Sequence, residues 1–130
     1  MAVPLTDAVR RVLEAPNYAH LATLMKDGSP QVSPVWVDVD GDHVLVNTAA
    51  GRLKERNVRR DPRVALSIRD LSRGEEEVTI RGRVVEITEE GARAHIDALS
   101  RKYAGHDYQG MKPGMVRLIL RIEVDHVTGG

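Results

Sequence analysis

The sequence predicts a mainly β (α+β) fold, in which six antiparallel strands form a small barrel with short flanking helices. Three observations lead to this prediction. Apolar and polar residues alternate along several segments, tight turns join the first of these segments, and helical periodicity is confined to short stretches between the others. Phe is absent, so Val, Leu and Ile fill the core, and β-branched residues suit pleated strands.

The composition describes one ordinary domain, residues 1–130, with 42% hydrophobic and 29% charged residues. The 19 Lys and Arg residues balance 19 Asp and Glu residues, and a neutral chain disfavours nucleic acid as a partner. The lack of Cys excludes a disulfide framework, a thiolate zinc site and a cysteine nucleophile. There is neither a signal-peptide pattern nor an apolar run of about 18 residues, so we expect a cytoplasmic protein without a membrane span.

A short helix and a three-stranded meander are predicted for the first part of the chain. Thr6 can cap the helix, whose apolar face contains Val9, Val12 and Leu13, and Pro16 helps to end it. Alternating segments then follow one another through two tight turns, each with Asp-Gly at its centre. The three predicted strands are residues 18–25, 31–40 and 43–48.

The second part of the chain supplies three further strands. Residues 64–68 alternate, a polar loop follows at 70–74, and residues 76–87 alternate until the phase slips at Val84-Val85. Because Gly82 lies beside this slip, we expect a bulge or sharp bend there.

A longer helix and the last strand complete the predicted fold. Thr88 is expected to cap the helix, and its apolar residues recur at helical spacing up to Tyr103. Residues 104–113 form an irregular loop, and residues 116–124 alternate as a strand before a loose end at 128–130. Ile119 interrupts the polar face of this strand, which indicates that part of that face is covered.

The strongest local feature is a basic helix predicted at residues 52–60. It follows a loop at 48–51, and the free N–H groups and dipole of a helix start favour an anion. Arg52 can donate two parallel hydrogen bonds to phosphate oxygens, and Lys54 adds a point charge. Arg59 and Arg60 lie near the helix C-terminus, where cations interact favourably with the helix dipole. A solvated basic face is the alternative interpretation.

Ser33-Pro34-Val35-Trp36 is the second feature. A Pro within a strand belongs at an edge or bulge, where neighbouring backbone groups are free to bond a flat heterocycle. Trp36 either lines such a pocket or lies in a dimer interface, since both places suit an amphipathic aromatic ring. The loop at 102–112 is either substrate-facing or a mobile connection.

No catalytic residue and no metal site are predicted. The five His residues lack metal-ligand spacing, and the G-x-S-x-G nucleophile motif is absent.

Three segments carry a family resemblance: residues 21–24, 27–36 and 51–64. They resemble the pyridoxamine 5′-phosphate oxidase-like split β-barrel superfamily, of the FMN-binding split barrel type. Within it, the chain is most similar to the short proteins that use coenzyme F420, the flavin/deazaflavin oxidoreductase B group. The resemblance implies a six-stranded split barrel and a homodimer with two cofactor sites at the subunit interface.

The resemblance also assigns cofactor-binding residues. The basic pair for the phosphate falls on Arg52 and Lys54, and Arg56 is a further candidate for a tail contact. The contacts at a strand end correspond to Asn47 and Thr48. The strand that lies along the ring system corresponds to Gln31, Ser33, Pro34 and Val35.

The function implied is hydride transfer from reduced F420 to a small unsaturated or quinone-like acceptor. The chain ends soon after its last strand and lacks the longer C-terminal segment of true pyridoxamine phosphate oxidases, which argues against vitamin B6 oxidation. Two alternatives remain: an FMN-dependent oxidase or reductase of the same fold, and a non-catalytic F420-binding or carrier protein.

Overall fold

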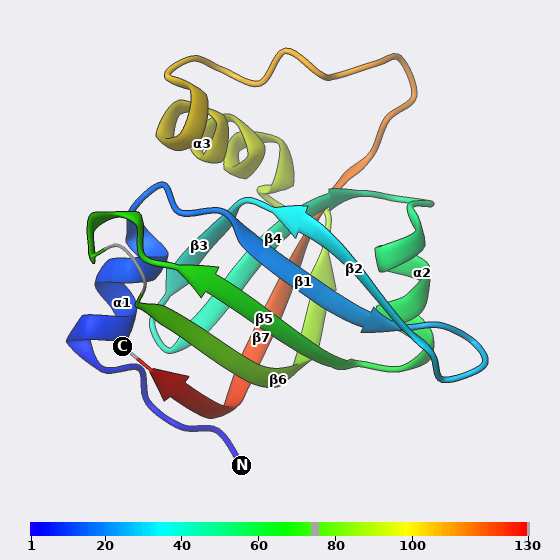
Figure 1. Cartoon of the computed structure of the whole chain (residues 1–130). Helices are drawn as coiled ribbons and strands as arrows, with labels where there is room; N and C mark the ends of the chain where they lie inside the picture. The colour runs from blue at the N-terminus through cyan, green and yellow to red at the C-terminus, as the bar shows by residue number, and fades with distance from the viewer. Residues whose placement is uncertain (74–75, 130) are drawn as a thin grey trace.

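The computed structural model describes residues 1–73 and 76–129, and its main feature is one curled antiparallel sheet (Figure 1). The strands are β1 (Ala19–Leu24), β2 (Pro30–Val35), β3 (Val37–Asp40), β4 (His43–Ala49), β5 (Arg63–Arg69), β6 (Glu77–Thr88) and β7 (Arg117–Gly129). The helices are α1 (Asp7–Glu14), α2 (Leu53–Arg60) and α3 (Ala92–Ala104), with a 3₁₀ turn at Leu71–Arg73. The mainly β split barrel predicted from the sequence is confirmed.

The strand count differs from the prediction, because the expected strand 31–40 is broken at Trp36. The sheet order is β2-β1-β5-β6-β7-β4-β3, so the two halves of this segment lie at opposite edges. Helix α3 holds the break in place: the Val37 N–H donates to the Tyr103 hydroxyl (3.1 Å) and Lys102 Nζ donates to the Val37 carbonyl (2.7 Å). The described residues therefore form seven strands rather than the predicted six.

The barrel interior is aliphatic, as the composition predicts. Strand β5 shows the expected alternation, with Val64, Leu66 and Ile68 buried. Residues from β1, β6 and β7 meet them, among them Leu21 and Ile80, which are fully buried. Burial of one such side chain stabilises the fold by about 1.5–3 kcal/mol.

Helix α1 packs across one side of the barrel (Figure 1) and forms as predicted. The Val9 N–H donates to Thr6 Oγ1 at 3.2 Å, which confirms the cap. Val9, Val12 and Leu13 are buried, and the Asn17 amide after the helix donates to the Val12 carbonyl.

The predicted bulge in β6 is confirmed. Its pairing with β7 shifts between Arg81 and Gly82 and again between Val84 and Glu86. A Cβ on Gly82 would lie 2.1 Å from the Glu123 carbonyl oxygen, so the strands approach closely there because this residue has no side chain.

Other boundaries differ from the prediction. Helix α3 begins after Gly91, in the left-handed conformation (φ 74°), and not at Thr88. Thr88 ends β6, and its hydroxyl accepts from the Glu90 N–H in the turn. The expected loose end is wrong as far as residue 129, because β7 continues to Gly129; residue 130 lies outside the described residues, as does residue 74 of the predicted polar loop.

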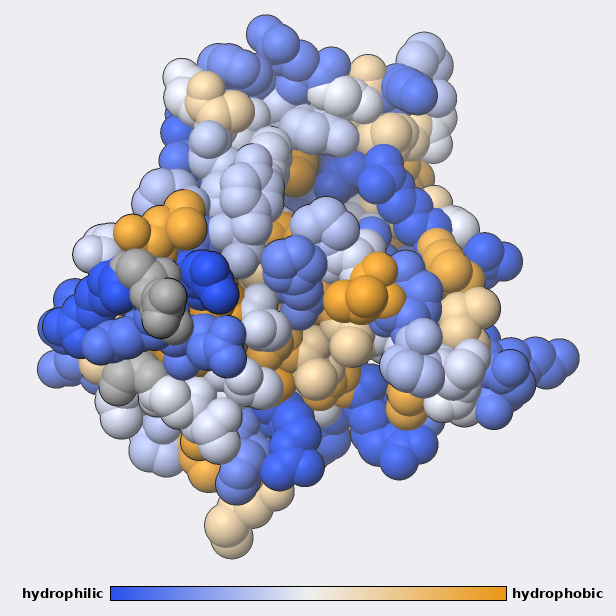
Figure 2. Space-filling model, viewed as in Figure 1, coloured by the Kyte–Doolittle hydropathy of each residue, from blue (hydrophilic) through white to orange (hydrophobic). Residues whose placement is uncertain are grey.

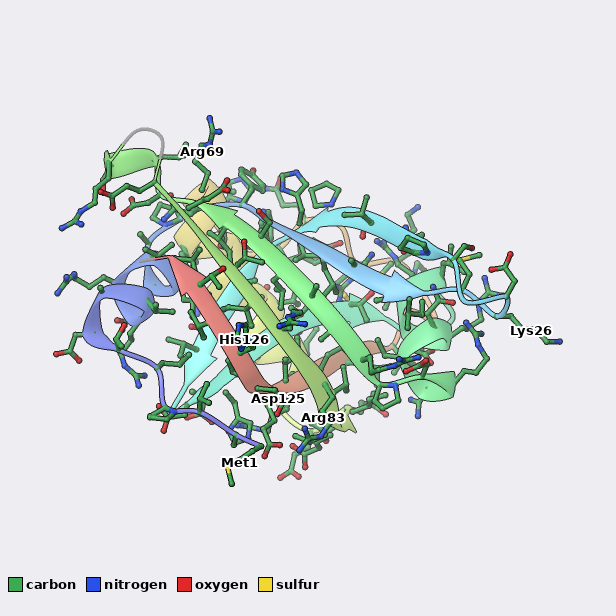
Figure 3. The ribbon with its side chains drawn as sticks, turned by 60° about the horizontal axis from the view of Figure 1, so that its bottom comes forward. Met1, Lys26, Arg69, Arg83, Asp125 and His126 are labelled. Carbon is green, nitrogen blue, oxygen red and sulfur yellow. The ribbon has the colours of Figure 1, made fainter. Side chains whose placement is uncertain are left out.

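Charged side chains lie at the outer side of the barrel near the N-terminus, where Figure 3 shows Met1, Arg83 and Asp125 close together. Asp125 accepts from Arg83 at 2.8 Å and pairs with the N-terminal ammonium at 3.2 Å. Arg83 also pairs with Glu123. In the described residues, none of the helices has the length and apolarity needed to cross a membrane.

Candidate functional site

A pocket of about 230 Å³ opens beside the break in the sheet. Its walls come from the ends of β2 and β4, the start of α2, one side of α3 and the first residue of β7. The lining residues are Tyr18, Pro34, Val35, Trp36, Asn47, Thr48, Arg52, Lys54, Ile96, Leu99, Tyr108 and Arg117.

The pocket lies in the gap between the two edges of the curled sheet, one formed by β2 and the other by β4 and β3. We call this gap the split. Strand β4 pairs with β7 along its whole length, but with β3 only from His43 to Val46. Residues 47–49 therefore have a free edge toward the split, within the chain as described. Strand β2 is the opposite terminal strand and pairs only with β1. Unpaired backbone groups on both sides can hydrogen-bond a ligand that lies in the split.

Three cations line the pocket. Arg52 is the N-cap residue of α2, Lys54 lies in its first turn, and Arg117 begins β7. Among residues 1–73 and 76–129, none of the ion pairs involves these three side chains. Burial, followed by the charges of Arg52 and Arg117, lowers the pKa of Lys54. A bound anion would relieve this repulsion.

The start of α2 leaves its N–H groups available. Arg52 provides no side-chain cap, since a guanidinium has no acceptor. Glu55, the only acidic residue of the helix, accepts from the Gly51 N–H (2.7 Å) and from Arg59 Nε (2.5 Å). Glu55 therefore neutralises Arg59, and it neutralises neither Arg52 nor Lys54.

The Thr48 hydroxyl is buried in the pocket wall without a partner. Its residue is only 2% exposed, and Thr48 Oγ1 makes no hydrogen bond within the described structure. Ser33 Oγ, on the strand at the other side of the split, is also buried and unpartnered. A buried hydroxyl without a partner costs about 1–3 kcal/mol. A polar ligand in the split would satisfy Thr48.

All four aromatic residues of the chain gather at this site. Trp36 stacks on Tyr103 with ring centroids 5.4 Å apart and planes 5° from parallel. Tyr18 contacts Tyr103, and Tyr108 meets Trp36 edge-on at 6.4 Å. Three of these rings line the pocket, and Tyr103 supports Trp36 from behind. The aliphatic core and the aromatic pocket are thus separate, and the pocket suits a flat ring.

Six of the nine predicted binding residues line the pocket: Pro34, Val35, Asn47, Thr48, Arg52 and Lys54. Gln31 and Ser33 do not; they lie earlier on β2, opposite the buried residues Thr23 and Leu21 of β1. Gln31 Oε1 accepts from Thr23 Oγ1 at 3.3 Å. Arg56 is exposed on α2, outside the pocket. The Asn47 amide is engaged within the protein, since its oxygen accepts from Arg117 and its nitrogen donates to the Ala92 carbonyl.

Arg117 is the functional candidate that the sequence reasoning missed. The strand pattern puts it on the polar face of β7, yet the residue is only 6% exposed. Arg117 Nε donates to Asn47 Oδ1 at 2.8 Å, and the guanidinium lies 5.1 Å from the centroid of the Tyr108 ring. The interruption of the polar face at Ile119 was the available signal, since α3 packs against β7. Tyr18 had no local signal, whereas Tyr108 lies in the loop 102–112, for which a substrate-facing role was one of the two interpretations.

Comparisons with known proteins agree with this fold. A family model described as "Pyridoxamine 5'-phosphate oxidase" matches residues 5–129. An F420 reductase is 28% identical with a TM-score of 0.84, and the match covers 95% of this chain and 98% of that one. A conserved hypothetical protein from Mycobacterium tuberculosis is 25% identical with a TM-score of 0.77, over 98% of this chain and 85% of the other.

A more distant structure, a protein of unknown function from Agrobacterium tumefaciens, is 20% identical with a TM-score of 0.74. That match covers 100% of this chain and 60% of the other, and it supports the fold alone. Together, the matches confirm the family resemblance that the motifs indicated.

Proposed function

Because the chain belongs to the pyridoxamine 5′-phosphate oxidase family, we propose that it is an oxidoreductase that binds coenzyme F420 in this pocket. The observation that carries the proposal is that three cations and a buried hydroxyl, all without a partner among residues 1–73 and 76–129, converge on a pocket lined by aromatic rings. A phosphorylated molecule with a flat ring system satisfies all of these groups at once.

The phosphate would lie at the start of α2. Arg52 and Lys54 flank the free N–H groups of this helix, and anions bind such helix starts readily. Arg117, the first residue of β7, adds a third positive charge near Arg52. A ligand without an anionic group would leave these charges unpaired.

The ring system would lie between the two sheet edges. Pro34, Val35 and Trp36 offer backbone groups and an aromatic surface on one side, and Thr48 offers its hydroxyl on the other. Ile96 and Leu99 of α3 form an apolar wall that excludes water. The free edges therefore match the polar rim of a tricyclic ring, and the apolar wall matches its face.

Reduced F420, when bound, supplies a hydride to an acceptor, which we propose is a small unsaturated or quinone-like molecule. The protein binds the cofactor, orients it and shields it from water. Carboxyl and imidazole groups are absent from the pocket lining of the described chain, so solvent can deliver the proton that completes the reduction.

The preference for F420 over FMN rests on Arg56. Both cofactors carry a ring, a ribityl chain and a phosphate, but F420 also has a tail with several carboxylates. Arg59 pairs with Glu55, and Arg60 donates to the Leu24 carbonyl and to Asn57, so both are engaged. Arg56 is exposed on the same helix and makes no ion pair among the described residues, so it is free to contact such a tail.

We also propose a homodimer whose second copy completes the site. Figure 2 shows hydrophobic residues over the middle of the face that carries β1, β2 and β5. On this outer face Val32, 61% exposed, lies beside Ala22, which in turn lies beside Ala65. A patch of this kind on a sheet beside an open pocket favours a subunit contact.

The dimer proposal is tested by sedimentation of Val32→Asp. We expect the variant to be monomeric at micromolar concentration, with Val85→Asp as the control because Val85 is also exposed but lies on β6. A monomeric wild-type protein would overturn the shared site.

The cofactor proposal is tested by titrating the purified protein with F420 and FMN side by side in a calorimeter. Tighter binding of F420 is the expected result, followed by turnover with an acceptor panel. Tighter binding of FMN would favour an FMN-dependent oxidase or reductase, since Arg52 and Lys54 serve either phosphate. Tight F420 binding without any turnover would favour a carrier protein.

A further inference from the structure

A series of side-chain contacts leads from Arg117 in the pocket through Asn47 of β4 to His95 of α3. Arg117 Nε donates to Asn47 Oδ1 at 2.8 Å, and Asn47 Nδ2 donates to the Ala92 carbonyl at 2.9 Å. These two contacts determine the orientation of the Asn47 amide: the oxygen must face the guanidinium, and the nitrogen must face the carbonyl.

The amide orientation in turn determines the tautomer of His95. Asn47 Nδ2 lies 3.2 Å from His95 Nδ1, so this ring nitrogen must accept and cannot carry a proton. The proton is then on His95 Nε2, which faces Asp38 Oδ2 at 3.5 Å. The imidazole projects from α3, is 9% exposed, and lies against Asn47 of β4 and Asp38 of β3, two neighbouring strands at one edge of the sheet.

From this geometry we infer that His95 is a positioning residue for Arg117: it holds the Asn47 amide, and the amide directs the guanidinium into the pocket. The inference rests on the proposed function, because it assumes that Arg117 meets an anion. It assigns a specific role to Asn47, whose amide is hydrogen-bonded within the protein, and to His95, which does not line the pocket.

A neutral acceptor suits this role. Arg117 makes no ion pair in the described chain, and the amide oxygen supports its Nε without cancelling its charge. A carboxylate at position 47 would form an ion pair with the guanidinium instead. The amide therefore fixes the direction of Arg117 while the positive charge stays available to a ligand.

The test compares three variants of the full-length protein by F420 titration. His95→Leu removes the acceptor for Asn47, and we expect F420 affinity to fall about threefold to tenfold, the effect of one lost hydrogen bond. His95→Asn puts an amide oxygen near the position of Nδ1 and should restore affinity to within about twofold of wild type. His106→Leu, an exposed histidine in the next loop, is the matched control and should change nothing.

A double-mutant cycle separates positioning from general structural support. In the Arg117→Met background, His95→Leu should cause no further loss of F420 affinity, because the guanidinium that it positions is gone. An equal loss in both backgrounds, or failure of His95→Asn to restore binding, would overturn the inference.

A second measurement needs no cofactor and decides the case if His95→Leu does not fold. Nitrogen NMR of the ligand-free wild-type protein should show His95 with its proton on Nε2, and the Arg117 Nε–H signal should be lost in Asn47→Ala. A proton on Nδ1, or an unchanged Arg117 signal, would overturn the inference. Failure of wild-type protein to bind F420, FMN or inorganic phosphate would instead contradict the proposed function.

Discussion

Arg83, on the outer side of the barrel, and the arginines at the pocket differ in whether carboxylates neutralise them. At the outer side of the barrel, Arg83 is matched by Asp125 and Glu123, and these carboxylates account for its charge. At the pocket, Arg52 and Arg117 lie near Lys54 without a carboxylate partner in the described residues. The first arrangement is complete within the protein, whereas we propose that a ligand completes the second. The difference identifies a binding site more clearly than the number of basic residues does.

Among the pocket variants, Lys54→Ala should cause the largest loss of F420 affinity. A hydrogen bond to a charged partner contributes about 1.5–3 kcal/mol, which corresponds to a loss of about tenfold to hundredfold in F420 affinity. Calorimetry measures the affinity, and circular dichroism checks the fold. Lys26→Ala is the control, because Figure 3 shows Lys26 at the tip of a turn, pointing into solvent. Unchanged affinity in Lys54→Ala would mean that α2 is only a solvated basic face.

Arg117→Met and Arg83→Met compare the two groups directly. Arg117→Met should lower F420 affinity about tenfold, by loss of a charged hydrogen bond, while leaving the thermal stability of the ligand-free protein unchanged or higher. Arg83→Met should lower the melting temperature slightly and leave affinity unchanged. Thermal unfolding with and without F420 measures both effects. The opposite pattern would show that Arg117 is a structural residue.

The pH dependence of binding tests whether the positive charge of Lys54 contributes to cofactor affinity. Burial, followed by the charges of Arg52 and Arg117, holds the pKa of Lys54 below the ordinary value of 10.5, so the ammonium is lost at a lower pH than in an exposed lysine. Affinity for FMN should therefore fall as the pH rises from about 7 through this lowered pKa, and Lys54→Arg should bind almost independently of pH there. In the same window, the stability of the ligand-free protein should rise with pH, because the unfolded chain binds more protons.

Arg56→Glu addresses the smallest effect, the contact with the F420 tail. We expect a loss of about threefold in F420 affinity and almost none in FMN affinity, because the residue is exposed and solvent screens its charge. The difference should shrink as salt is added. Equal losses for both cofactors would contradict a tail contact at Arg56.

The sequence by itself determined the parts of this protein that depend on neighbours along the chain. Thr6 caps α1, the alternation in β5 places Val64, Leu66 and Ile68 inside, and the phase slip at Val84-Val85 marks the bulge. The loop and helix start that present Arg52 and Lys54 are also local, which is why these two residues could be predicted.

Only the tertiary structure decided the rest of the site. The break at Trp36 forms because Lys102 and Tyr103, on a distant helix, hold the backbone of Val37. Arg117 follows a strand pattern that is typical of a solvent-facing residue, yet the packing of α3 against β7 buries it. Contacts between residues far apart in the sequence leave no periodicity, so the sequence pattern could not decide between the two roles open to Trp36 and did not place Arg117 in the pocket.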